Sequence, residues 1–128
     1  FNFVFAMSSV ATQLYISHTL LELVLGAIKL RGTYSGFEMP PGTEKFARHH
    51  GVALLSLALL GALVLARRLI DTAAGEVCST VLAFFHAGAV IVMLHALNGK
   101  VVLLHLPWAL GFAWHVWSVR QRPKSSVA

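Results

Sequence analysis

Two long apolar runs fill the second half of the chain, with a short polar turn between them. No Asp, Glu, Lys or Arg occurs between Val77 and Gly99, or between Val101 and Val119. About 20 apolar residues in a helix cross the ~30 Å hydrocarbon layer of a bilayer. The turn at Asn98-Gly99-Lys100 is short, so the two helices should be antiparallel neighbours. This pattern predicts a transmembrane helical hairpin.

A second pair of apolar runs precedes this hairpin. The first run carries His18 and Glu22, which lie four residues apart and therefore on one helix face, predicted to look into the protein. The Gly- and Pro-rich stretch 31–41 is a predicted loop, and Asp71 a predicted N-cap for the third helix. A stripe of small residues in the second run should allow close helix contact; it comprises Ala58, Gly61, Ala62 and Ala66.

The fold class predicted from these runs is an all-α membrane protein, a bundle of four transmembrane helices with short loops. Residues 1–128 form a single transmembrane domain, with spans at about 8–30, 44–67, 72–97 and 101–119 and a polar tail at 120–128. The composition agrees, because a chain with 57% hydrophobic and 12% charged residues is too apolar for a soluble domain of this size. The sequence begins at Phe1, so we expect a processed or incomplete product.

The net charge of +5 does not indicate nucleic-acid binding. The Lys and Arg residues fall mainly at the ends of the apolar runs, where they meet lipid headgroups. The expected partners are therefore membrane lipids and other transmembrane subunits, with no nucleic acid. The sequence shows no nucleotide-binding glycine loop, Ser-His-Asp order or CxxC pair, and we do not expect an enzyme of those classes.

Seven histidines are many for so apolar a chain, and their depths in the membrane suggest two layers. Counted from Leu30 and Asn98 at 1.5 Å per residue, His18 and His86 both lie about 18 Å from one membrane face. His115, counted from Lys100, lies at about 22 Å and joins them in an inner layer. The outer layer, near the same face, comprises His49, His50, His95 and His105.

Buried imidazole is a common axial ligand of haem iron, and the same nitrogen can bind chlorophyll magnesium. A bis-histidine haem b needs two imidazoles at matched depth, which His18 with His86, or His95 with His105, would provide. Chlorophyll needs one ligand per ring. We therefore expect tetrapyrrole, either chlorophyll or haem b, at some of five cofactor-binding candidates: His18, His86, His95, His105 and His115. Alternatively, each histidine merely hydrogen-bonds across the bundle. The outer layer lacks the spacing of a zinc site.

Glu22 supports a different hypothesis, because a carboxylate inside a span is costly and usually functional. In size and span count the chain is similar to small four-span multidrug exporters, in which a first-span glutamate exchanges protons for cationic drugs. Glu22 is then the proton-coupling candidate. Three functions stay open: an accessory subunit of a photosynthetic or respiratory complex that contacts tetrapyrroles, a haem b electron carrier, or a proton-coupled transporter. The expected location is a thylakoid, mitochondrial inner or bacterial cytoplasmic membrane.

Overall fold

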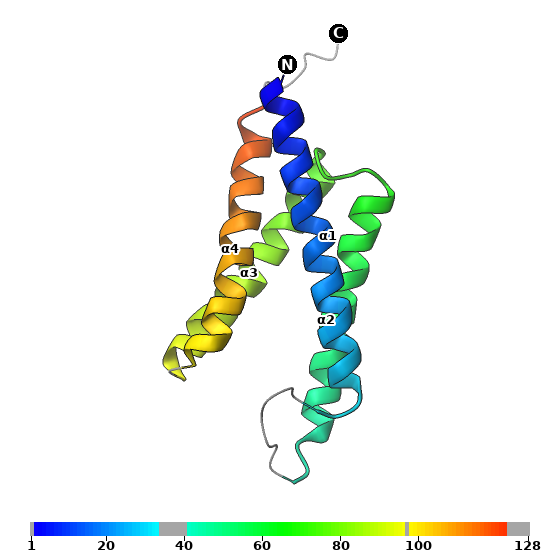
Figure 1. The fold of residues 1–128 in the computed structure, drawn as a ribbon, viewed down its shortest axis with the longest axis vertical. Helices are drawn as coiled ribbons and strands as arrows, with labels where there is room; N and C mark the ends of the chain where they lie inside the picture. Colours follow the sequence, from blue (N-terminus) through cyan, green and yellow to red (C-terminus); the bar gives the residue numbers. More distant parts are fainter. Residues whose placement is uncertain (1, 34–40, 97, 123–128) are drawn as a thin grey trace.

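The protein is all-α, as the sequence predicts. The structure is a computed structural model and describes residues 2–33, 41–96 and 98–122. Its four helices follow one another along the chain (Figure 1): α1 (Asn2–Leu30), α2 (Glu44–Ala66), α3 (Ala73–His95) and α4 (Gly99–Arg120). Most of the predicted loop at 31–41, and most of the predicted polar tail, lie outside the described residues.

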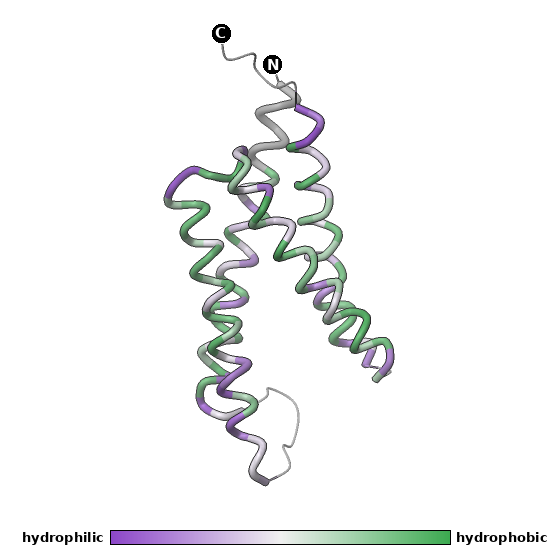
Figure 2. The backbone as a smooth tube through the Cα atoms, turned by 180° about the vertical axis from the view of Figure 1, so that it is seen from behind, coloured by the Kyte–Doolittle hydropathy of each residue, from purple (hydrophilic) through white to green (hydrophobic). Residues whose placement is uncertain are grey.

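Each helix is long and apolar enough to cross a membrane. The candidate spans are Val10–Leu30, Glu44–Ala66, Ala73–His95 and Gly99–Arg120, of 21, 23, 23 and 22 residues. At 1.5 Å per residue, each covers the ~30 Å hydrocarbon layer. Hydrophobic residues predominate along all four helices (Figure 2). Large apolar side chains such as Leu59, Phe84 and Leu103 are exposed. The chain is therefore an integral membrane protein.

The start of α3 is capped by a side chain. The N-cap of α3 is Thr72, whose hydroxyl accepts a hydrogen bond from the Gly75 amide. This corrects the sequence-based assignment of Asp71, whose carboxylate instead pairs with Arg122 at 2.8 Å. Helix α4 runs without a break through Pro107.

The bundle consists of two helical hairpins, α1–α2 and α3–α4. They lie together near the chain termini and diverge toward the α1–α2 and α3–α4 connections (Figures 1 and 2). Glycines allow α1 and α2 to pack closely: a Cβ added at Gly51 would lie 2.8 Å from the Leu30 backbone nitrogen, and one added at Gly26 would lie 2.8 Å from Leu55 Cγ. Backbone contact of this kind is typical of small residues in membrane helices.

The buried face of α2 differs from the predicted alanine stripe. Buried positions in α2 recur at intervals of three and four residues: Ala47, Gly51, Leu54, Ala58, Gly61 and Val64. Ala62 and Ala66 are exposed. The glycines at 51 and 61, together with Ala58, form the contact face, because the true interval along a packed helix face alternates between three and four.

An apolar core forms where the two hairpins meet. It contains Ala11, Tyr15, Val64, Ile70, Leu82 and Phe112. The Tyr15 and Phe112 rings pack edge to face, with centroids 5.3 Å apart. This core fixes α1 against α3 and α4 on one side of the buried histidines.

Candidate functional site: a buried histidine–glutamate cluster

Polar residues line the inner faces of helices α1 and α3 at helical intervals. On α1 they are Tyr15, His18 and Glu22, and on α3 they are Ser79 and His86, seven residues apart. Positions three, four and seven apart share a helix face, so these side chains point to the same side. All five are buried, although the helices around them are apolar.

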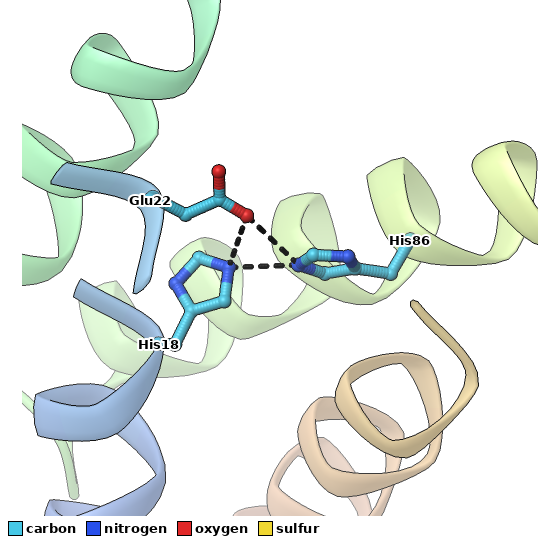
Figure 3. Close-up of side chains that lie close together, drawn as sticks. All are labelled: His18, Glu22 and His86. Carbon is cyan, nitrogen blue, oxygen red and sulfur yellow. Dashed lines mark hydrogen bonds and ion pairs between the residues drawn. The ribbon is translucent and has the colours of Figure 1, made fainter. Parts of the chain in front are cut away.

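The central feature is a cluster of His18 and Glu22 from α1 with His86 from α3 (Figure 3). The Nε2 atoms of His18 and His86 lie 2.7 Å apart. Glu22 Oε1 lies 3.4 Å from His18 Nε2 and 3.9 Å from His86 Nε2. Both histidines are 0% exposed and Glu22 is 1% exposed. Three potential ligand atoms thus converge on one point inside the bundle.

His105 of α4 extends the cluster on its far side. Its Nδ1 atom lies 2.8 Å from His86 Nδ1, so both ring nitrogens of His86 have imidazole partners. In each of these two contacts one nitrogen carries the proton and the other accepts it. The protonation of His86 is therefore coupled to the protonation of His18 and of His105.

A second polar group lies toward the end of the bundle that carries the termini. Tyr15 Oη lies 2.6 Å from Ser79 Oγ, which lies 2.7 Å from His115 Nδ1. Tyr15 also donates to the Gly75 carbonyl at 3.1 Å. These contacts tie α1, α3 and α4 together in one hydrogen-bonded chain.

Aromatic rings separate the two polar groups. The Phe112 ring lies 5.3 Å from the Tyr15 ring and 5.0 Å from the His18 ring, measured between centroids. Trp108 packs on His18 at 5.3 Å. The Phe112 ring therefore packs between the histidine–glutamate cluster and the second polar group.

Three buried polar atoms of the two groups have no hydrogen-bond partner among the described residues: Glu22 Oε2, His18 Nδ1 and His115 Nε2. A buried polar atom without a partner costs about 1–3 kcal/mol, and more when it is charged. Folding alone does not favour such an arrangement. Unpaired polar atoms at the centre of an apolar bundle are typical of a functional site.

The structure brings together some of the predicted site residues and separates others. His18 and His86 are in contact, and Glu22 lies beside them. Depth along the helix predicts His115 in the same layer, whereas its side chain contacts Ser79 in the second polar group. Whether any of these residues binds a cofactor stays a prediction.

The structure does not gather the four outer histidines into one cluster. His105 contacts His86 rather than His95, and His95 is exposed near the end of α3. His49 is exposed, and His50 lies 3.0 Å from the Lys29 ammonium nitrogen. Counting residues gives only the height of a Cα atom, whereas the rotation of each helix determines which side chains meet.

Sequence reasoning missed Tyr15 and Ser79. The signal was present, because Tyr15 precedes His18 by three residues and Ser79 precedes His86 by seven, so each shares a helix face with a histidine. A hydroxyl on the inner face of a membrane helix usually has an interhelical partner.

The chain matches no protein-family model, and comparisons with curated proteins and with solved structures found no match.

Proposed function

We propose that this chain is a small integral-membrane accessory subunit that holds a metal-centred cofactor through its interior histidines. One observation supports this most strongly: ligand atoms of His18, Glu22 and His86 all lie within 4.8 Å of one another and are buried. Imidazole nitrogen and carboxylate oxygen are common protein ligands of transition metals.

The cost of burial supports a functional role for the cluster. A carboxylate inside a membrane span is unfavourable, and Glu22 also leaves one oxygen without a partner among the described residues. A bound cation would neutralise this carboxylate and accept the lone pairs of both imidazoles. The same residues without a cation would destabilise the bundle.

We also propose that the subunit belongs to a larger membrane complex, either photosynthetic or respiratory. Large apolar side chains are exposed on all four helices, among them Leu20, Leu59, Phe84 and Leu110. Such a surface suits lipid tails or the helices of a neighbouring subunit. The described part of the chain has little mass outside its four spans, which fits a subunit working within an assembly.

The test is the absorption spectrum and metal content of the purified protein, or of the assembly that contains it. We expect a stoichiometric metal, present as an ion or as chlorophyll or haem, that is lost from a His86→Leu variant. His95→Leu, which changes an exposed histidine on the same helix, should retain it. A colourless, metal-free preparation from native membrane would overturn the proposal.

A transport assay on Glu22 variants tests the alternative function, a proton-coupled exporter. If protein reconstituted alone in liposomes transports a cationic substrate in exchange for protons, driven by a proton gradient, and Glu22→Gln abolishes this activity, the exporter interpretation replaces the cofactor one. Val24→Leu is the matched control, because Val24 lies on the exposed face of the same helix.

A further inference from the structure

The geometry points to a single divalent transition-metal ion, bound directly by His18 Nε2, His86 Nε2 and Glu22 without a tetrapyrrole ring. This inference rests on the proposed function and names the class of its cofactor. Two imidazoles and one carboxylate are a ligand set used by zinc and by non-haem iron sites that keep open positions for water or substrate.

The spacing of the three ligand atoms fits one ion. With metal–ligand bonds of about 2.0–2.1 Å and tetrahedral angles, neighbouring ligand atoms lie about 3.3 Å apart. The observed separations are 2.7 Å between the two Nε2 atoms, and 3.4 and 3.9 Å from these to Glu22 Oε1. An adjustment of about 0.6 Å, within reach of small side-chain rotations, therefore makes all three distances suitable.

The same spacing argues against a ring-bound metal at this point. A tetrapyrrole fills four coplanar positions around its metal and leaves only two, on opposite sides. Opposite imidazoles with bonds of about 2.0 Å would have their nitrogens about 4 Å apart, with the ring between them. Here His18 and His86 are 2.7 Å apart, and Glu22 points to the same place. Three protein ligands converging on one point can share a bare ion only.

His105 acts as a positioning residue for this site. When His86 Nε2 binds the ion, its proton must lie on Nδ1, where it is donated to His105 Nδ1 at 2.8 Å. Metal-bound histidines usually donate their other N–H in this way, which fixes the tautomer and the ring orientation. His105 lies on the same face of α4 as Trp108 and Phe112, and all three rings pack against His86.

The remaining coordination is left to small ligands. Glu22 Oε2 has no partner among the described residues, so the carboxylate can bind through one oxygen or through both. Three protein ligands leave at least one position for water or another small molecule. The neighbouring Phe112 and Trp108 rings limit access to it.

The experiment uses the full chain in detergent, stripped with a chelator and then titrated with Zn²⁺ or Co²⁺. We expect one ion per chain, with visible Co²⁺ bands of a four- or five-coordinate site. Glu22→Gln and His86→Gln should weaken binding at least tenfold. His105→Gln should weaken it about 10- to 100-fold with the stoichiometry unchanged. His95→Gln, an exposed histidine on α3, should bind as the wild type does.

A measurement on the unaltered protein covers the case in which a variant fails to fold. Cu²⁺ bound to the wild type should show nitrogen couplings from two imidazoles in electron paramagnetic resonance. Couplings from fewer than two, no ion bound, or equal affinity in folded Glu22→Gln would each overturn the inference. If the native preparation instead holds a tetrapyrrole that depends on His86, the proposed function stands and this inference fails. If it holds neither pigment nor metal, both fail.

Discussion

The Tyr15 hydroxyl of α1 lies 2.6 Å from Ser79 Oγ of α3, and so joins the two helical hairpins through their polar interior. Ser79 Oγ in turn lies 2.7 Å from His115 Nδ1 of α4. Tyr15 also belongs to the apolar core, where the two hairpins meet. It therefore holds α1 and α3 at the spacing that lets His18 meet His86.

Removing the hydroxyl in Tyr15→Phe should lower the free energy of unfolding by about 1 kcal/mol, the usual scale for a hydrogen bond between membrane helices. Unfolding in mixed micelles measures it. The control is Ser17→Ala, because the Ser17 hydroxyl is exposed and donates to the Gln13 and Leu14 carbonyls of its own helix. Equal stabilities for both variants would show that the Tyr15–Ser79 contact does not join the hairpins.

The contact between α1 and α2 depends on glycine at position 51. A Cβ there would meet the Leu30 nitrogen at 2.8 Å and the Gly26 oxygen at 2.9 Å, and backbone atoms cannot move aside easily. Gly51→Ala should cost about 1–3 kcal/mol in the same unfolding assay. Gly88→Ala is the matched control, because its added Cβ meets nothing within 4 Å. It should leave stability unchanged or slightly raised.

In the metal-free protein, Glu22→Leu should raise the free energy of unfolding by about 1–3 kcal/mol, since it removes a buried carboxyl oxygen that has no hydrogen-bond partner among the described residues. Chelator-treated protein in detergent is the sample, and Val24→Leu on the exposed face should have no effect. A less stable Glu22→Leu protein would indicate that the carboxylate serves the fold rather than a ligand.

Adding Zn²⁺ to the stripped wild type should raise its stability. An ion present at 100 times its dissociation constant contributes about 2.7 kcal/mol when it binds the folded state alone. Thermal unfolding with and without Zn²⁺ measures the shift. At the same Zn²⁺ concentration the shift should fall to about half or less in His86→Gln, as expected for binding at least tenfold weaker, and should persist in His95→Gln. A rise of the same size in both would place the bound zinc elsewhere.

The fold was predictable because apolar length is a strong signal in a membrane chain. The second and fourth helices begin within two residues of their expected starts, whereas α1 begins at Asn2, earlier than the expected residue 8. Local context explains the remaining differences: Thr72 rather than Asp71 caps α3, because its hydroxyl is placed to accept from Gly75.

The candidate site was only partly predictable. The four-residue spacing of His18 and Glu22 places them on one face, and equal depth placed His86 opposite, so these three could be chosen from sequence. The contact between His105 and His86 could not be predicted from the sequence, because it depends on how α4 is rotated against α3. That rotation arises from packing of Trp108 and Phe112 around His86. Counting residues along the sequence cannot reveal this packing.

The division into two hairpins has a consequence for how the protein is made. His18 and Glu22 leave the ribosome with α1, well before the α3 residue that faces them has been synthesised. Until the later hairpin arrives, the newly inserted one presents a carboxylate and an imidazole to acyl chains or to the insertion machinery. Biogenesis therefore passes through a half-inserted intermediate with an uncovered polar face.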